Sequence, residues 1–279
     1  MDKAIQRERA EQFRRLHDGP EILVVGSAWD GGSAVVFERE GFDAIATSSA
    51  GIAFSLGYPD GQRMSRVELL AAVARVVRAT RLPVSADIEA GYGGTPHEVS
   101  ETCRGVLEAG AIGVNLEDAT GDDAQPLFEA APQAEKIRAA RAMANAFGVP
   151  LVINARTDGY LLQLGDETTR FADAVQRLNL YRAAGADCLF VPGVVDAATI
   201  ARLVRAIDGP LNILATAGAP PVAELAALGV RRVSQGSGPA RAALATARRV
   251  ARELVTQGTY AAYSLDTIGY AEANRLFAR

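Results

Sequence analysis

The chain has little of what a zinc site or a disulfide framework needs. Among 279 residues it contains two cysteines, Cys103 and Cys188, and two histidines, His17 and His97. Their spacing does not match a zinc motif, so a soft-metal site has almost no ligands. Cys103 lies in a helical pattern and Cys188 opens an apolar run, which is typical of buried small hydrophobic residues and not of a disulfide in a reducing compartment.

Excess positive charge and long apolar runs are also missing. Lys and Arg number 29 against 33 Asp and Glu, a formal net charge of −4, so no basic surface for nucleic acid is expected. Residues 1–10 are charged and amphipathic and lack the apolar core of a secretory signal, and no uninterrupted run of about 18 apolar residues occurs. We therefore expect a cytoplasmic protein without a nucleic-acid or membrane partner.

The chain does contain a repeated pattern. A helix end, a glycine suited to a left-handed C-cap and a short apolar strand recur at 40–45, 108–114, 183–189 and 227–233. This is the joint between helix and strand in a repeating β/α protein. Hydrophobic residues make up 49% of the chain and charged residues 22%, which is ordinary for a globular protein with a large core.

Eight apolar runs bounded by turn residues are predicted to be strands. They lie near 21–25, 43–47, 83–87, 112–116, 150–154, 187–191, 211–214 and 231–234. Such strands, separated by amphipathic helices, indicate parallel strands buried on both faces. Eight strands close a barrel, although the same units also build a doubly wound open sheet. We expect an α/β fold, a (β/α)8 TIM barrel formed by residues 1–279 as one domain, with a helix near 2–17 covering its bottom.

A further segment follows the last predicted helix, 239–257, and a bare barrel does not require it. Its side chains Tyr263, Ile268, Leu276 and Phe277 need an apolar partner. We expect residues 258–279 to form a C-terminal oligomerisation helix that packs on another subunit. A helix folded back on its own barrel is the alternative.

The most informative stretch is 85–94, which reads Ser-Ala-Asp-Ile-Glu-Ala-Gly-Tyr-Gly-Gly. In an extended strand, side chains alternate between faces, so Asp87 and Glu89 are predicted to point the same way. The glycines that follow allow a turn that other residues resist. Two carboxylates this close repel unless a cation or a proton neutralises them.

Polar residues follow several predicted strands, and the carboxyl ends of barrel strands meet at one mouth. They are the residues 47–51 and 58–61 after the second strand, Asp87 and Glu89 after the third, Asn115, Glu117 and Asp118 after the fourth, and Asn154, Arg156 and Asp158 after the fifth. An oxygen-rich set of this kind suits Mg²⁺ or Mn²⁺. Any single acid could instead cap a helix, as Asp118 and Asp158 could.

Two further features point to an anionic ligand. Arg156 offers a planar, bidentate grip on a carboxylate or phosphate, or alternatively a salt bridge to Glu117 or Asp158. The run 48–51, Ser-Ser-Ala-Gly, supplies hydroxyls and backbone N–H groups that form an anion nest for a substrate carboxylate.

With these residues placed, the chain resembles the isocitrate lyase/phosphoenolpyruvate mutase superfamily over nearly its whole length. The resemblance is carried by Leu56-Gly-Tyr-Pro-Asp60, Asp87-Ile-Glu-Ala-Gly-Tyr-Gly93, the pair Glu117-Asp118 and the run Asn154-Ala-Arg-Thr-Asp158. It implies a barrel whose last helix is exchanged between neighbours in a homotetramer, a dimer of dimers. It also implies an Mg²⁺ (or Mn²⁺) enzyme that acts on small 2-oxo or 2-hydroxy carboxylates.

The resemblance also implies roles for individual residues. Asp60, Asp87, Glu89 and Glu117 would hold the metal and its waters. Ser49, Ala50 and Gly51 would hold the substrate carboxylate, and Arg156, Glu117 and Asp60 are the expected catalytic residues, with Arg156 also binding substrate. Asn212 and Thr216 both lie near the strand-seven carboxylate contact, and Asn212 is the substrate-binding candidate there.

Several positions depart from the family pattern. Glu89 stands where the family usually has Asp. The loop 119–126 lacks the Cys, His and Lys residues of the isocitrate and methylisocitrate lyases and the Lys of the phosphoenolpyruvate mutases, and Pro192-Gly193 replaces a glutamate of the lyases. If the loop 119–132, a predicted lid, supplies a proton donor, the candidates are Thr120, Asp122 and Asp123.

These features together predict an Mg²⁺-dependent carbon–carbon lyase that acts on a small 2-hydroxy or 2-oxo di- or tricarboxylate through an enolate-like intermediate. One alternative is a carbon–phosphorus bond enzyme of the phosphoenolpyruvate mutase or phosphonopyruvate hydrolase type, with Asp60 as nucleophile. The other is a barrel that binds a carboxylate without turnover, which the missing loop residues favour.

Overall fold

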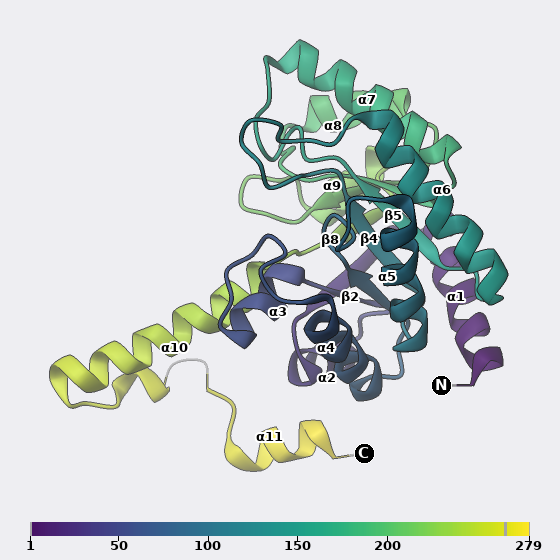
Figure 1. Cartoon of the computed structure of the whole chain (residues 1–279). Coiled ribbons are helices and arrows are strands. Elements are labelled where there is room, and N and C mark those ends of the chain that lie inside the picture. Colours follow the sequence, from purple (N-terminus) through teal and green to yellow (C-terminus); the bar gives the residue numbers. More distant parts are fainter. Residues whose placement is uncertain (1, 265–266, 279) are drawn as a thin grey trace.

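Eight parallel strands form a closed barrel in the computed structural model, which describes residues 2–264 and 267–278 (Figure 1). Neighbouring strands pair in sequence order, and β8 pairs with β1 to close the barrel. The strands are β1 (Leu23–Ala28), β2 (Ile45–Thr47), β3 (Val84–Asp87), β4 (Gly113–Glu117), β5 (Val152–Arg156), β6 (Cys188–Val191), β7 (Leu211–Leu214) and β8 (Arg232–Ser234). The predicted (β/α)8 TIM barrel is therefore confirmed.

Helices cover the outside of the barrel (Figure 1). They are α1 (Lys3–Asp18), α2 (Gly31–Arg39), α3 (Ser49–Leu56), α4 (Arg66–Ala79), α5 (Pro96–Glu108), α6 (Ala130–Phe147), α7 (Glu167–Ala183), α8 (Ala197–Ala206), α9 (Val222–Ala227), α10 (Gly238–Gln257) and α11 (Tyr270–Phe277), with a 3₁₀ turn η1 (Ala261–Ser264). Local sequence fixes several starts: Ser65 and Thr95 each open a capping box with the glutamate three residues later.

The observed strands differ most from the predicted ones at β1, which runs to Ala28 and not only to residue 25. Glycine is typical of turns, but Gly26 lies within the strand and pairs with Ile45 of β2. A Cβ atom at Gly26 would lie 2.7 Å from the ring of Phe37 in α2. The glycine is therefore needed for close packing of a helix on the strand, and not for a turn.

The first helix covers the amino-terminal end of the barrel, as predicted. The side-chain amide of Gln6 donates to the carbonyl of Ala111, just before β4, at 2.9 Å. Phe13 and His17 are buried and contact Arg232, the first residue of β8. This helix therefore forms the floor of the barrel, opposite the carboxyl ends of the strands.

Both cysteines are free and buried, Cys103 in α5 and Cys188 at the start of β6, as the sequence predicts. In residues 2–264 and 267–278, none of the helices combines the length and the apolar character that crossing a membrane requires.

The C-terminal segment differs from the prediction of one helix over 258–279. Gly258, with φ of 67°, ends α10, and the chain continues as η1 and the short α11, while positions 265–266 and 279 lie outside the described residues. The helix α10 projects away from the barrel (Figure 1). The helix α11 packs on α2 of the same chain, where Arg39 Nη2 donates to the carbonyl of Ala278 at 3.0 Å. Exchange of the last helix between subunits stays a prediction.

Candidate active site

A cavity of about 310 Å³ opens at the carboxyl ends of the strands, and every strand contributes to its wall. It is lined by Ser27, Ala46, Thr47, Ser48, Ser49, Ala50, Asp60, Asp87, Asn115, Asn154, Arg156, Leu161, Phe190, Pro192, Leu214, Thr216, Arg232, Ser234, Gly236, Ser237 and Arg241. A larger hollow of about 640 Å³ lies between α2, α4 and α11, away from the strand ends. The strand-end cavity is therefore the candidate active site.

Part of the predicted site lines this cavity. The predicted residues that face it are Asp60, Asp87, Arg156, Ser49 and Ala50. The predicted residues that do not line it are Glu89, Glu117, Gly51 and Asn212.

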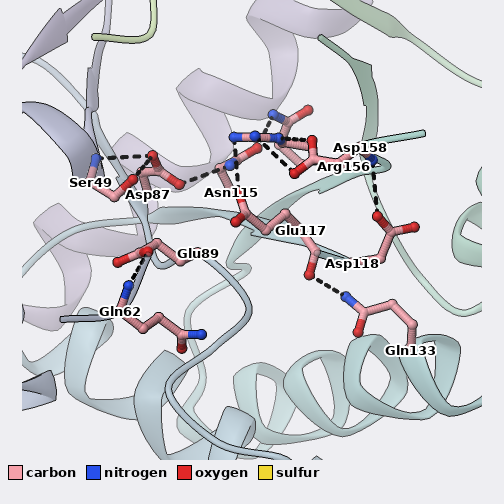
Figure 2. Close-up of polar contacts among 11 residues, drawn as sticks. Ser49, Gln62, Asp87, Glu89, Asn115, Glu117, Asp118, Gln133, Arg156 and Asp158 are labelled. Atoms are coloured by element: carbon pink, nitrogen blue, oxygen red, sulfur yellow. Dashed lines mark hydrogen bonds and ion pairs between the residues drawn. The ribbon is translucent and has the colours of Figure 1, made fainter. Parts of the chain in front are cut away.

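Asp87, the last residue of β3, is held by three hydrogen bonds (Figure 2). Its Oδ2 accepts from the N–H and the hydroxyl of Ser49 at 3.0 and 2.7 Å, and its Oδ1 accepts from Nδ2 of Asn115 at 2.9 Å. Asn115 in turn accepts from Nδ2 of Asn154 at 2.9 Å. These three hydrogen bonds fix the position of the carboxylate in the cavity wall.

Glu89 does not share the face of Asp87 by strand alternation, and that prediction is wrong. The strand β3 ends at Asp87, and Glu89 has φ of 52°, a left-handed conformation that turns the chain. Its carboxylate accepts from the N–H of Gln62 at 2.5 Å (Figure 2). It also accepts from the hydroxyl of Tyr92 at 2.8 Å. Glu89 therefore ties the loop between α3 and α4 to the loop after β3.

The pKa values of three carboxyl groups, those of Asp60, Glu89 and Glu117, are raised, and the charge of Asp87 contributes to each shift. Burial raises the pKa of Asp60, and the charge of Asp87 raises it further. Burial raises the pKa of Glu89 to about 7, and Asp87 again adds to the shift. Burial also raises the pKa of Glu117 well above its usual range. Raised pKa values of this kind favour the binding of a proton or a cation.

Arg156, the last residue of β5, lies between two carboxylates (Figure 2). Its Nη1 is 2.9 Å from Oε2 of Glu117, and its Nε is 2.5 Å from Oδ1 of Asp158. Burial alone would lower the pKa of Arg156, but these two carboxylates outweigh burial and raise it. The guanidinium therefore stays charged, and its orientation at the cavity is fixed by both partners.

Asp118 is fully buried and does not line the cavity. It accepts from the N–H of Asp158 at 3.0 Å and from the hydroxyl of Tyr181 at 2.8 Å. These bonds join the end of β4 to the end of β5. Asp118 therefore holds the segment that positions Arg156.

The expected anion nest at 48–51 is partly occupied by the protein's own groups. The N–H of Ser49 donates to Asp87, and the N–H of Gly51 donates to the hydroxyl of Ser48, which caps α3. A Cβ atom at Gly51 would lie 2.8 Å from Cβ of Trp29, so this glycine allows close packing. Ser49 and Ala50 remain the members of this run that were predicted to bind substrate and that line the cavity.

At the seventh strand, Asn212 is fully buried below the cavity wall. Its Nδ2 donates to the hydroxyl of Ser234 at 3.2 Å, and Ser234 lines the cavity. Asn212 therefore supports a lining residue, whereas Thr216 faces the cavity itself.

The sequence interpretation missed the contribution of β8 and the start of α10. The residues concerned are Arg232, Ser234, Gly236, Ser237 and Arg241. A signal was present, because alternate residues of a barrel strand share the face that points inward. Applied to the predicted eighth strand, that rule selects the arginine and the serine.

An apolar wall closes one side of the cavity and was also missed. It consists of Leu161, Phe190, Pro192 and Leu214. Gly193 has φ of 89°, and a Cβ atom there would lie 2.8 Å from the backbone of Leu161. The pair Pro192-Gly193, which replaces a glutamate of the resembled lyases, thus brings two loops into direct backbone contact.

The predicted lid is folded on itself next to the cavity. The N–H of Thr120 donates to the carbonyl of Pro126 at 3.0 Å, and α6 begins at Ala130. Asp122 and Asp123 are exposed and border a separate hollow of about 260 Å³. In this arrangement none of the three candidate proton donors lines the strand-end cavity.

No three or more Asp, Glu, His or Cys side chains gather in a way that could hold a metal ion, within the part of the chain that the structure describes. Glu89 is bound to Gln62 and Tyr92, and Glu117 is paired with Arg156. Asp60 and Asp87 are the predicted metal ligands that face the cavity. Two carboxylates fit an ion such as Mg²⁺, which fills its remaining positions with water and substrate.

The amino-acid sequence of this chain is similar to those of several known proteins. The profile of a family described as phosphoenolpyruvate phosphomutase matches residues 13–255. An uncharacterised protein of Mycobacterium tuberculosis strain H37Rv is 37% identical over 86% of this chain and 87% of its own length. An oxaloacetate decarboxylase of Chromohalobacter salexigens is 33% identical over 83% and 80%, and a 2-methylisocitrate lyase of Bacillus subtilis is 33% identical over 66% and 60%.

Solved structures agree with this placement. A protein of Burkholderia cenocepacia J2315 is 41% identical, with a TM-score of 0.92 over 99% of this chain and 98% of that one. A 2,3-dimethylmalate lyase of the phosphoenolpyruvate mutase/isocitrate lyase superfamily is 27% identical, with a TM-score of 0.82 over 96% and 94%. An oxaloacetate acetylhydrolase in complex with oxalate is 25% identical, with a TM-score of 0.84 over 96% and 93%.

Proposed function

Because the chain belongs to the phosphoenolpyruvate phosphomutase family, whose members include lyases and mutases, we propose that it is an Mg²⁺-dependent carbon–carbon lyase. Its substrate is a small 2-oxo or 2-hydroxy di- or tricarboxylate. The observation that carries the proposal is that Asp60, Asp87 and Arg156 face one cavity at the strand ends. Two carboxylates suit a hard dication, and an arginine suits an organic carboxylate.

Arg156 provides the positive charge that the reaction requires. Cleavage of a bond to the carbon next to a carbonyl group leaves its electron pair as an enolate, with negative charge on the carbonyl oxygen, and a fixed cation near that oxygen stabilises it. Because Glu117 and Asp158 hold the guanidinium in place, it needs no reorganisation during the reaction. A bound Mg²⁺ or Mn²⁺, held by Asp87 and Asp60 and backed through water by Glu89 and Glu117, would polarise the same carbonyl group.

The part of the cavity wall that follows β7 and β8 suits a second anionic group. Thr216 and Ser237 supply hydroxyls there, and Arg241 has no side-chain ion pair or hydrogen bond within the described residues. A substrate with two carboxylates would place one beside Arg156 and the other beside Arg241. This division favours a dicarboxylate over a monocarboxylate.

Product formation tests the proposal. Purified protein with Mg²⁺ is expected to release pyruvate or another 2-oxo acid from oxaloacetate, 2-methylisocitrate or 2,3-dimethylmalate, in an assay coupled to lactate dehydrogenase. Asp87→Ala is expected to abolish turnover and Mg²⁺ binding in calorimetry, because it removes the best-held carboxylate of the cavity. Asp122→Ala, which removes an exposed acid outside the cavity, is the matched control and is expected to keep both.

Other outcomes of the same assay separate the alternatives. Phosphate release from phosphonopyruvate, without 2-oxo acid release from any carboxylate, would favour a carbon–phosphorus enzyme with Asp60 as nucleophile. Tight binding of oxalate without turnover of any compound would favour a carboxylate-binding barrel.

We also propose a homotetramer, a dimer of dimers in which the C-terminal helices contact neighbouring subunits. The support is α10, a helix of 20 residues of which only Ala240 is buried within the chain. Leu244 and Leu254 lie on its surface, 49% and 45% exposed. A long helix with exposed leucines requires an apolar partner, and another copy of this chain is the partner that the family resemblance implies.

A further inference from the structure

Arg232 is a buried charge without a carboxylate partner. It opens β8, is 1% exposed and belongs to the wall of the cavity. Its Nε makes no hydrogen bond, and its guanidinium forms no ion pair among residues 2–264 and 267–278. By contrast, Arg156 in the same wall is paired with both Glu117 and Asp158.

The groups around Arg232 do not neutralise it. Its Nη1 lies 3.4 Å from Nε2 of His17, and its guanidinium lies 5.6 Å from the centre of the Phe13 ring. The Nδ1 of His17 is 2.8 Å from the carbonyl of Phe13, so Nδ1 carries the hydrogen and Nε2 is an acceptor on a neutral ring. Burial lowers the pKa of Arg232, and electrostatic interactions with Cys188 and Asp87 act in the opposite direction.

An unpaired buried charge destabilises a folded protein, because the desolvation of the ion is not offset by attraction to a counter-charge. Of the two acids that line the cavity, Asp87 already accepts three hydrogen bonds, and both are the proposed ligands of a dication. The wall also contains Arg156, which is paired, and Arg241 at the mouth. The charge that is missing from the bottom of this cavity is therefore negative.

We propose that Arg232 is an anion-attracting charge beneath the cavity, whose counter-charge is the bound carboxylate substrate. In the absence of substrate, this buried charge lowers the stability of the fold, and substrate binding restores that stability. The inference rests on the proposed function, because that function supplies an anionic ligand. Arg232 acts through the electric field in a site of low dielectric constant, and not by direct catalysis.

The test is a pair of measurements that are expected to move in opposite directions. Arg232→Met keeps a long unbranched side chain and removes the charge. It is expected to raise the melting temperature of the ligand-free protein by a few degrees and to weaken oxalate binding, in excess Mg²⁺, by about tenfold. Arg232→Lys retains the charge and is expected to restore most of the oxalate affinity. Calorimetry and thermal unfolding measure the two effects.

A purely structural arginine gives a different pattern. Arg232→Met would then melt at a lower temperature and, where folded, bind oxalate as tightly as the native protein, and this outcome would overturn the inference while leaving the proposed function intact. Arg232→Gln, which keeps polar atoms, serves if the methionine variant does not fold. Failure of both variants to fold would also overturn the inference.

A second anion distinguishes failure of this inference from failure of the proposed function. If the native protein does not bind oxalate, sulfate serves as a second anion. Tighter sulfate binding by the native protein than by Arg232→Met would support the anion-attracting charge and contradict only the carboxylate lyase. Absence of binding for both anions would contradict both proposals.

Discussion

At the scale of single residues, the polar interior of the barrel is organised by directed hydrogen bonds. Asn154 donates to Asn115, which donates to Asp87, so the chain of amides ends on a carboxylate. On the floor, Phe13 accepts from His17, whose other ring nitrogen faces Arg232. The carboxylate is thus fixed in position, while the histidine is held neutral.

The neutral state of His17 predicts a pH dependence of stability. Burial, and next the charge of Arg232, lower the pKa of His17 to about 3. Because this lies below the value of about 6.5 in the unfolded chain, the unfolded state binds a proton first as the pH falls. The contribution of His17 is fully present above about pH 6.5 and is lost toward pH 3, by about 1 kcal/mol for each pH unit between about pH 6 and pH 4.

Urea unfolding at several pH values checks this prediction. His17→Gln is expected to lose stability less steeply than the native protein over this pH range. His97→Gln is the matched control, because His97 is exposed, and it should retain the native slope. Equal slopes for His17→Gln and the native protein would contradict the assignment.

Residue-level interpretation of the sequence succeeded where the backbone stayed regular. Asp87 and Arg156 end strands, and the side-chain alternation of a barrel strand places both in the cavity wall. Glu89 departs from this rule because its φ of 52° is set by contacts with another loop. Strand alternation marks Arg232 as facing inward, but it does not show that the side chain is buried without a carboxylate partner.

At the scale of secondary-structure elements, two loops meet backbone to backbone beside the apolar cavity wall. Gly193, after β6, combines φ of 89° with a distance of 2.8 Å between its ideal Cβ position and Leu161. The sequences of the two loops do not predict this contact, because the contact depends on how the fifth and sixth strands are placed in the barrel. The glycine repeats that predicted the helix-to-strand joints carry no such long-range information.

Gly193→Ala is therefore expected to be more harmful than an ordinary glycine substitution. It combines a left-handed backbone with a clash against a main chain that cannot rotate away, and we expect a loss of about 2 to 4 kcal/mol in the free energy of unfolding. Substrate affinity should fall as well, because Leu161 and Pro192 line the cavity. Gly57→Ala is the control, because Gly57 has φ of 84° but an added Cβ meets nothing within 4 Å.

Unfolding in urea compares the two variants. The Gly57 variant should lose about 1 kcal/mol, from backbone strain alone. If Gly193→Ala loses no more than this control, the loop contact does not contribute as described.

At the scale of the whole molecule, the repeated joints and the eight apolar runs were enough to predict a closed barrel. The C-terminal segment was harder, because Gly258 breaks it and its partner is not encoded locally. In this chain α11 rests on α2, but α10 extends from the barrel with little covering it (Figure 1). The exposed leucines of α10 suit the subunit contact proposed above.

The exposed leucines of α10 give the last prediction. Leu244 and Leu254 have the spacing of one helix face, and a charge on each should prevent burial against another copy. Leu244→Asp with Leu254→Asp is expected to convert a tetramer into smaller species in analytical ultracentrifugation, while circular dichroism of the barrel stays unchanged. Arg248→Asp with Arg252→Asp, two polar positions of the same helix, is the control for added negative charge. A monomeric native protein, or an unchanged tetramer in the leucine variant, would show that this face is not the subunit contact.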